Sequence, residues 1–205
     1  MMQPAVAIII AGPTAVGKSE MAMQLAAHFN TAIISAYSRQ CYKELTIGTA
    51  KPDAEELQSV PHYFINSHNI KEEVNAGIFE QYSLQYAGEI LSKNKTVIVC
   101  GGTGLYVKAF CEGINAIPGI PPSIREKVRK DYELNGLLWL QKELQKNDPD
   151  FFPIAEIKNP QRLMRALEVY LTTGHSITDF WKKNTDRPFS IIKIGLKLSK
   201  EILHD

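Results

Sequence analysis

Residues 5–19 read Ala5-Val-Ala-Ile-Ile-Ile-Ala11-Gly12-Pro-Thr-Ala-Val-Gly-Lys18-Ser19. The part up to Ala11 is a continuous apolar run, which is typical of a strand buried on both faces in a parallel sheet. The part from Gly12 matches the pattern Gly-x-x-x-x-Gly-Lys-Ser of a loop that binds phosphate groups. Apolar residues then recur at helical spacing from Lys18 to Phe29, so the loop lies between a predicted strand and a predicted helix, as this motif requires.

The loop residues are suited to hold an anion. The two glycines let backbone amides turn towards phosphate oxygens, and the N-terminus of the helix adds positive potential. Lys18 supplies a mobile positive charge, and Ser19 offers a hydroxyl to Mg²⁺. The motif predicts binding of a diphosphate or triphosphate, as in a nucleotide, without identifying the rest of the ligand. The residues expected to bind phosphate are Gly12, Pro13, Thr14, Ala15, Val16, Gly17, Lys18 and Ser19.

Further strands and helices alternate along the chain. Thr31–Ser35, Thr96–Cys100 and Ser190–Leu196 are short apolar runs that predict strands, and Ala76–Leu91 has the spacing of a helix. This order predicts an α/β fold, a P-loop NTPase-like doubly wound parallel sheet with a small inserted helical region. Because ligands of such sheets bind at the carboxyl edge of the strands, we expect the chemistry in the turns that follow them.

A helical region interrupts this alternation. The proline-rich Ile117–Pro122 is a stiff linker, and Ser123-Ile-Arg-Glu126 has the form of a capping box that opens a helix. That helix is expected to end at Gly136, and a second one runs from Leu137 to Lys146. Asn159-Pro160 predicts the start of a strong helix through Thr173. We therefore divide the chain into a core at 1–112, an inserted helical region at 113–158 and a return to the core at 159–205.

Composition says little about partners. The 205 residues include 23 Lys and Arg against 22 Asp and Glu, a formal net charge of +1, so no global charge indicates nucleic acid or an anionic membrane. The apolar run near the start is too short to cross a bilayer and lacks the pattern of a signal peptide, so we expect a cytoplasmic protein with no membrane partner. Cys41, Cys100 and Cys111 lack the spacing of a disulfide framework or a zinc site. We expect reduced thiols and no histidine or cysteine metal site.

Two classes of nucleotide hydrolase fit the sequence poorly. A hydrolase with this loop normally has an aspartate at the end of a second apolar strand to hold Mg²⁺. Here Val97–Cys100 runs directly into Gly101-Gly-Thr-Gly104, and no Asn-Lys-x-Asp guanine signature occurs. This disfavours a GTPase and a conventional ATPase. A kinase of small molecules, with the inserted helices as a closing lid, stays open as an alternative.

Four separated motifs resemble those of one family, the tRNA dimethylallyltransferases, also called tRNA isopentenyltransferases. The first motif is the phosphate loop. The others follow in the family's order, and they are Ile34-Ser-Ala-Tyr-Ser-Arg-Gln40 running into Ile47-Gly-Thr-Ala-Lys-Pro52, Gly101-Gly-Thr-Gly-Leu-Tyr106, and Asn159-Pro-Gln-Arg-Leu-Met-Arg-Ala-Leu-Glu-Val169. The resemblance covers essentially the whole chain, and four motifs in order are far more specific than any one alone.

The resemblance implies an activity and a set of site residues. Members of the family transfer a dimethylallyl group from dimethylallyl diphosphate to N6 of the adenosine on the 3′ side of the tRNA anticodon, and diphosphate leaves. By resemblance, Lys18, Arg165 and Mg²⁺ at Ser19 bind the diphosphate, while Lys18, Thr103 and the residue at position 37 are catalytic. We expect a monomer. The residues implied to contact the anticodon stem loop are Tyr37, Ser38, Arg39, Gln40, Thr103, Arg125, Gln161, Arg162 and Arg165.

Two features depart from the family pattern. Where this chain has Tyr37 the family has an aspartate, which is thought to accept the proton or hydrogen bond of the adenine amine, and the acid closest in sequence is Glu44. A carboxyl group with a pKa of about 4 only accepts at neutral pH, whereas a phenol with a pKa of about 10 is neutral and mainly donates. The chain also ends early for the family, so the family's C-terminal helices are expected to be absent. A catalytically impaired relative that still binds tRNA is therefore a further alternative.

Overall fold

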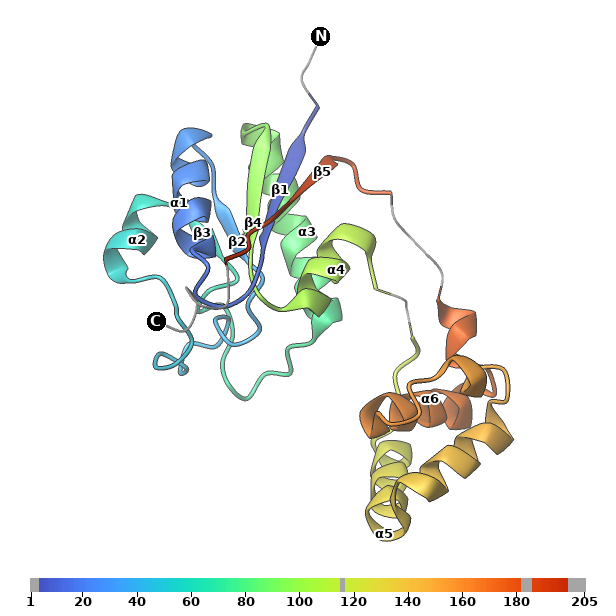
Figure 1. Cartoon of the computed structure of the whole chain (residues 1–205). Coiled ribbons are helices and arrows are strands. Elements are labelled where there is room, and N and C mark those ends of the chain that lie inside the picture. The colour runs from blue at the N-terminus through green and yellow to red at the C-terminus, as the bar shows by residue number, and fades with distance from the viewer. Residues whose placement is uncertain (1–3, 115–116, 182–185, 199–205) are drawn as a thin grey trace. The chain divides into compact units, whose positions relative to one another are not determined.

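The computed structural model describes residues 4–114, 117–181 and 186–198 (Figure 1). Contacts divide the chain into two compact units. The sheet unit comprises the residues up to Ile114 and from Asn184 onward, and the helical unit comprises Asn115–Lys183. The chain therefore crosses from one unit to the other twice.

The sheet unit is built on a five-stranded sheet with the order β3-β2-β4-β1-β5. All four strand pairings are parallel, and β1 pairs with β4 on one side and with β5 on the other. This arrangement confirms the predicted doubly wound parallel sheet. The strands are β1 (Val6–Ala11), β2 (Ile33–Ser35), β3 (His62–Tyr63), β4 (Thr96–Cys100) and β5 (Ser190–Gly195).

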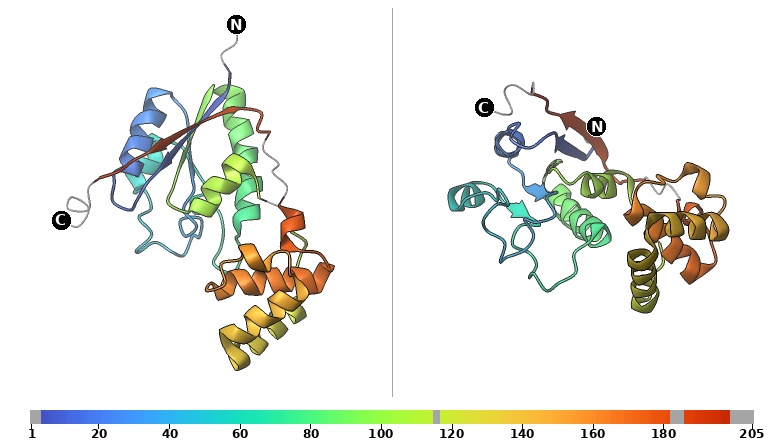
Figure 2. Two further views of the ribbon diagram at one scale, coloured as in Figure 1. Left: turned by 45° about the vertical axis from the view of Figure 1, so that its right-hand side comes forward. Right: turned by 60° about the horizontal axis from the view of Figure 1, so that its bottom comes forward.

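Helices cover both faces of this sheet (Figures 1 and 2). On one face lies α1 (Lys18–His28), whose alanines pack against β1, β2 and β4. On the other face lie α3 (Ala76–Lys93) and α4 (Gly104–Glu112), which pack against each other and against the same strands. A short helix, α2 (Ala54–Ser59), precedes β3.

The composition of β1 follows from its place between two layers. Ile8 and Ile10 belong to the buried cluster beneath α1, whereas Ala7 and Ile9 belong to the cluster beneath α3 and α4. Successive side chains of a strand point to opposite faces, so a strand covered on both sides has no position for a polar residue. This explains why the run is apolar throughout.

The ends of β2 and β4 approach so closely that only glycine fits at position 101. A Cβ atom on Gly101 would lie 2.2 Å from the carbonyl oxygen of Ala36 and 2.3 Å from its carbonyl carbon. Ala36 is held in place, since its N–H donates to the carbonyl of Cys100 at 2.8 Å and its own carbonyl accepts from Thr103 N at 3.1 Å. A side chain at position 101 would therefore push against backbone that cannot move without losing these bonds.

We expect Gly101→Ala to lower the free energy of unfolding by about 3 kcal/mol, because the new methyl group meets fixed backbone and not a flexible side chain. Gly88→Ala is the matched control. A Cβ atom on Gly88 in α3 meets nothing within 4 Å, and alanine should stabilise the helix by about 0.5–1 kcal/mol. Urea unfolding followed by circular dichroism measures both changes, and an unchanged midpoint for Gly101→Ala would contradict the close approach.

The described residues of the helical unit, 117–181, form two long helices and two short 3₁₀ segments. α5 (Pro122–Asn147) is interrupted at Gly136, where φ is 73° and ψ is −170°, so the predicted end of a helix at this glycine is confirmed. α6 (Pro160–Thr173) packs against α5. The 3₁₀ segments are Phe152–Ile154 and Ile177–Phe180. Apolar residues buried between these elements include Val128, Leu140, Leu144, Leu163 and Leu167.

Both ends of α6 are as predicted. The side chain of Asn159 accepts a hydrogen bond from Arg162 N at 3.3 Å, and Pro160 occupies the first turn, where its missing N–H costs nothing. Gly174 ends the helix with a left-handed φ of 73°. This conformation is one that glycine adopts without strain.

Three features differ from the expectations. The Ser123–Glu126 capping box does not form, because Pro122 already occupies the first turn of α5 and places Ser123 inside the helix, with no side-chain cap. α6 lies in the helical unit and not in the core, because its apolar face is buried against α5; the chain rejoins the sheet unit only at Asn184. α4 was not predicted, since Gly101 to Gly104 reads as a turn.

The cysteines are buried in the sheet unit and unpaired, as expected for reduced thiols. Burial raises the pKa of Cys41 to about 11 and that of Cys100 to about 11, and it also raises the pKa of Cys111. All three are therefore neutral thiols at neutral pH. Among the helices of the described ranges, none is both long and apolar enough to cross a bilayer.

Candidate functional site

Three neighbouring strand ends bring the predicted residues of the sheet unit together. β2, β4 and β1 are adjacent in the sheet. The segment after β2 contains Tyr37 and Ser38, the turn after β4 contains Thr103, and the phosphate loop follows β1. Because parallel strands place their carboxyl ends at one edge, these segments form a single candidate site.

The phosphate loop has the conformation of an anion cradle. Gly17 precedes α1 with a left-handed φ of 84°, and no side chain caps this end of the helix, so the first amides of α1 are available to a ligand. Lys18 is only 5% exposed, and its Nζ donates to the carbonyl of Pro13 within the loop. Burial lowers the pKa of Lys18. Within the described part of the chain, the lysine charge is thus held over the loop with a single hydrogen-bond partner, and an anion would stabilise it further.

Tyr37 lies beside both chemical groups of the loop. The centre of its ring is 5.9 Å from Lys18 Nζ, and its side chain lines the same pocket as Ser19 and Cys100. Burial raises the pKa of Tyr37 to about 12. The group at this position is therefore a neutral phenol at neutral pH, which can donate a hydrogen bond but does not act as a base.

Thr103 joins the turn after β4 to the segment after β2. It is the residue that precedes α4, and its Oγ1 accepts a hydrogen bond from Ser38 N at 3.1 Å. Its own Oγ1 also lies 3.4 Å from Ser38 Oγ, and its N–H donates to Ala36. The structure thus brings Thr103 and Ser38 together, with two hydroxyl groups at one point of the site.

Gln40 holds a neighbouring loop in place. Its side-chain oxygen accepts from Ser35 Oγ at 2.7 Å, and its side-chain nitrogen donates to the carbonyls of Thr49 at 3.1 Å and Ala50 at 2.7 Å. The residue is 3% exposed. Its polar atoms therefore connect the Ile34–Gln40 and Ile47–Pro52 motifs to each other, while the adjacent Arg39 is exposed.

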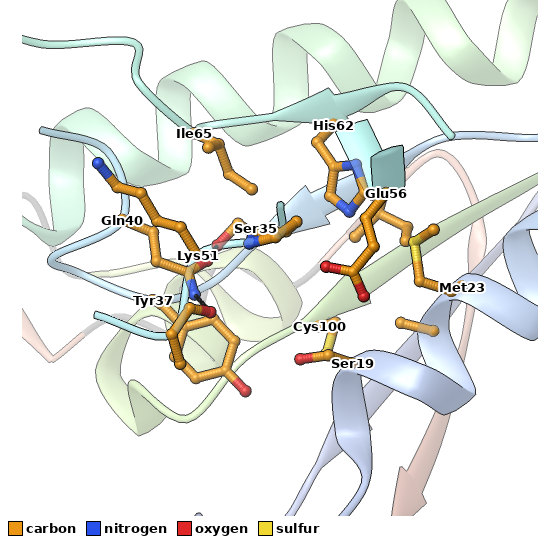
Figure 3. A pocket seen from close by; sticks show the side chains of 14 residues that line it. Ser19, Met23, Ser35, Tyr37, Gln40, Lys51, Glu56, His62, Ile65 and Cys100 are labelled. Atoms are coloured by element: carbon orange, nitrogen blue, oxygen red, sulfur yellow. Dashed lines mark hydrogen bonds between the residues drawn. The ribbon is translucent and has the colours of Figure 1, made fainter. Parts of the chain in front are cut away.

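A pocket opens beside the phosphate loop (Figure 3). Its wall includes Ser19 and Met23 of α1, Ser35 of β2, and Tyr37 and Cys100. Figure 3 shows the Glu56 carboxylate directed from α2 into this space. The pocket therefore adjoins both the Ser19 hydroxyl at the end of the phosphate loop and the phenol of Tyr37.

The lining of this pocket also includes polar residues that were not predicted as site residues, among them Lys51, Glu56 and His62. Glu56 forms a capping box with Asp53, a pattern that Asp53-x-x-Glu56 shows in the sequence. Burial lowers the pKa of His62, whose Nδ1 lies 2.8 Å from the carbonyl of Val60. The acid closest to Tyr37 in sequence, Glu44, instead accepts a hydrogen bond from Ile70 N at 2.9 Å.

The remaining predicted residues lie in the helical unit. Arg125 is exposed on the first part of α5, and Gln161 is exposed on α6. Arg162 forms an exposed ion pair with Glu156 at 3.1 Å. Arg165 is 3.6 Å from a carboxylate oxygen of the largely buried Glu168. Arg125, Gln161 and Arg162 are thus exposed to solvent, and Arg165 is partly exposed.

Comparison with known families supports the assignment made from the motifs. The family model described as IPP transferase matches residues 40–205, which is most of the chain. The chain belongs to this family. The match is independent of the phosphate loop, which lies outside the matched residues.

The chain is similar in sequence to tRNA dimethylallyltransferases of two bacteria. The tRNA dimethylallyltransferase of Cytophaga hutchinsonii is 47% identical over 198 residues, which are 96% of this chain and 65% of the relative. That of Christiangramia forsetii is 41% identical and covers 97% of this chain and 66% of the relative. The chain therefore spans slightly less than two thirds of the length of these curated relatives.

Solved structures of IPP transferase family enzymes share the fold. A eukaryotic dimethylallyltransferase captured while acting on tRNA matches with a TM-score of 0.80 and 28% identity, over 97% of this chain and 50% of that one. The tRNA isopentenylpyrophosphate transferase of Bacillus halodurans matches with a TM-score of 0.61 and 30% identity, over 98% of this chain and 63% of that one. Both matches extend over nearly the whole of this chain.

Proposed function

We propose that this chain transfers a dimethylallyl group from dimethylallyl diphosphate to N6 of the adenosine on the 3′ side of a tRNA anticodon, with release of diphosphate. The observation that carries the proposal is the juxtaposition of the phosphate loop with Thr103 and Ser38 at adjacent strand ends. A 47% identical relative is a tRNA dimethylallyltransferase, which favours prenyl transfer over the kinase alternative.

The phosphate loop acts on the leaving group. The loop amides and Lys18 bind the diphosphate of the donor and stabilise the negative charge that grows on its bridging oxygen. The lone pair of the adenine N6 forms the new C–N bond while the C–O bond to diphosphate breaks and its electron pair leaves with the oxygen. Because Lys18 is already desolvated, it interacts with this developing charge more strongly than a hydrated lysine would.

The loop also fits a magnesium ion. The described residues contain no group of three or more His, Cys, Asp or Glu side chains that could form a metal cage. Mg²⁺ in phosphate sites is instead held by a few protein oxygens, phosphate oxygens and water, and the exposed Ser19 hydroxyl supplies such an oxygen. When bound there, the ion would add positive charge at the diphosphate.

The part of the site proposed to bind the adenine amine offers the hydroxyl groups of Thr103 and Ser38, and position 37 supplies no carboxylate there. Thr103 and Ser38 can orient the adenine amine through hydrogen bonds, and Arg39 is exposed next to them for contact with RNA. Arg125, Gln161, Arg162 and Arg165 of the helical unit bind the anticodon stem loop in this proposal, and Arg165 adds to diphosphate binding. The proton that N6 loses has no carboxylate acceptor at position 37, so it passes to solvent water.

This last point favours a second candidate function. Tyr37 is a neutral phenol, and loss of a general base typically costs a factor of about 100 to 10,000 in rate. A chain with this residue would still bind the donor and tRNA. The second candidate is therefore a tRNA-binding relative with very slow transfer.

Mass spectrometry of nucleosides tests the proposal. Unmodified tRNA is incubated with the protein, Mg²⁺ and dimethylallyl diphosphate, then digested, and N6-dimethylallyladenosine is quantified over hours. We expect product above that of the Lys18→Ala variant, which lacks the loop charge. Binding of an anticodon stem loop without product would identify the second candidate, and saturable phosphorylation of a small molecule by ATP would reinstate the kinase.

A further inference from the structure

Ile47 is the most exposed large apolar side chain in the described part of the chain. It is 95% exposed, and the next in order, Leu134, is 82% exposed. A single apolar residue on a surface is common and needs no function by itself. Ile47 differs from such residues because the loop that carries it, residues 45–52 of the sheet unit, is held firmly in place beside the candidate site.

The 45–52 loop is stabilised by bonds within itself and by an unusual backbone. Thr49 Oγ1 donates to the carbonyl of Leu45 at 3.2 Å and lies 3.4 Å from the carbonyl oxygen of Thr46. Gly48 has a left-handed φ of 73°, and Ala50 has one of 47°. Alanine rarely adopts this conformation, so it persists only where the surrounding structure holds the backbone.

Gln40 and Lys51 hold this loop from the side of the sheet. Both N–H groups of the buried Gln40 amide have acceptors in the loop, the carbonyls of Thr49 and Ala50. Lys51 Nζ donates to the carbonyl of Tyr42 at 2.6 Å and to Asn66 Oδ1 at 2.8 Å. Since the donors of Gln40 are used inside the chain, its part in the RNA-contacting segment is to fix the loop.

The fixed loop forms one wall of the candidate site. Ala50, Lys51 and Pro52 line the same pocket as Tyr37 (Figure 3). Ile47 lies three residues before this wall, and the exposed Arg39 directly precedes Gln40. Two segments joined by Gln40 thus present a guanidinium group and an apolar side chain. Sites for single-stranded nucleic acid combine such groups, a cation for the phosphates and an apolar surface for the face of a base.

We propose that Ile47 packs against the face of a base next to the acceptor adenosine, with Gln40 as the positioning residue that holds the 45–52 loop. The inference rests on the proposed function. An enzyme that reacts at a base atom draws the base out of its stack, and isoleucine is among the apolar side chains that enter between unstacked bases. A loop that is fixed before RNA binds loses less conformational freedom on binding.

Four variants and a control separate this contact from general stability. Ile47→Ser removes the apolar surface, and Ile47→Leu is the conservative variant. Gln40→Met keeps the length of the side chain but removes both donors, and it is also combined with Ile47→Ser. Ile192→Ser is the matched control, because Ile192 is 49% exposed on β5, at the opposite edge of the sheet from β3. Urea unfolding checks the fold of each variant.

The first measurement does not depend on catalysis. An anticodon stem loop carries 2-aminopurine in place of the acceptor adenosine; this base has no N6 amine, so it cannot react, and its fluorescence rises when it leaves the stack. We expect saturating wild-type protein and Ile47→Leu to give the full rise, and Ile192→Ser to match them. Ile47→Ser should lose at least half of the rise and bind about tenfold more weakly. A full rise with folded Ile47→Ser would overturn the proposal.

The second measurement tests the role of Gln40. We expect Gln40→Met to weaken binding of the same stem loop, and the double variant to bind no more weakly than Ile47→Ser alone, because Gln40 acts through the loop. Binding of inorganic diphosphate should stay within twofold in every variant. Losses of RNA affinity that multiply in the double variant, or a parallel loss of diphosphate binding, would contradict a positioning role.

Failure of the proposed function is distinguishable from failure of this inference. If the wild type binds the stem loop but makes no dimethylallyladenosine with the unmodified RNA, prenyl transfer fails, whereas the fluorescence still decides on Ile47. If product forms and Ile47→Ser gives the full rise, only the role of Ile47 fails. An RNA signal unchanged by Ile47→Ser, together with altered sedimentation of the chain, would assign Ile47 to a contact between copies and overturn the proposal.

Discussion

Lys18→Ala is expected to weaken binding of dimethylallyl diphosphate by about a hundredfold, which corresponds to about 2.8 kcal/mol. The lysine charge lies over the phosphate loop, is 5% exposed and has the carbonyl of Pro13 as its only hydrogen-bond partner in the described residues. A diphosphate would replace that neutral partner by charge-assisted hydrogen bonds, which are roughly twice as strong. Titration calorimetry with dimethylallyl diphosphate, and with inorganic diphosphate as the minimal ligand, measures the loss.

The same substitution should leave the fold intact. Burial lowers the pKa of Lys18, which means that the folded chain holds this charge at a cost when no anion is bound. Removing the charge is therefore expected to leave the thermal midpoint unchanged or slightly raised. Lys43→Ala, an exposed lysine outside the pocket, serves as the control for net charge. Unchanged donor affinity in folded Lys18→Ala would refute the phosphate-loop assignment.

The parts of the fold that could be predicted are determined by residues close together in the sequence. The strand, glycine loop and helix at Ala5–Phe29 are encoded by consecutive residues, and so is the cap of α6 at Asn159-Pro160. The prediction was wrong at the starts of two helices, where neighbouring residues favour different structures. Pro122 took the first helical position ahead of the Ser123 cap, and the glycines before α4 concealed a helix that starts in their midst.

The parts that could not be predicted depend on contacts between distant segments. In the sequence, Gly101 looks like a flexible turn residue. In the structure, glycine is needed at this position because the backbone of Ala36, which follows β2, leaves no room for a side chain. Glu56 and His62 enter the pocket only because α2 and β3 fold back beside β2. The sequence of α6 shows that one side of the helix is apolar, but it does not show which element covers that side. In the structure the apolar side packs against α5, and this contact places α6 in the helical unit.

Tyr37→Asp is expected to raise the single-turnover rate of prenyl transfer by about a hundredfold to ten-thousandfold, the range that a general base supplies. The wild-type phenol has a pKa of about 12 and so stays protonated at neutral pH. An aspartate at this position would be ionised, since Lys18 lies close to the same side chain and favours the negative form. Rapid-quench measurement with donor and tRNA both saturating isolates the chemical step from binding.

Tyr37→Phe is the matched control, because it keeps the ring beside Lys18 and removes only the hydroxyl group. We expect it to remain as slow as the wild type, since the phenol contributes no base. A rate for Tyr37→Phe equal to that of Tyr37→Asp would mean that the tyrosine hydroxyl itself slows the reaction and that a carboxylate at this position is not needed. Equal rates for the wild type and Tyr37→Asp would show that proton removal from N6 does not depend on position 37, and Glu56, whose carboxylate points into the same pocket, would then be the next acid to replace.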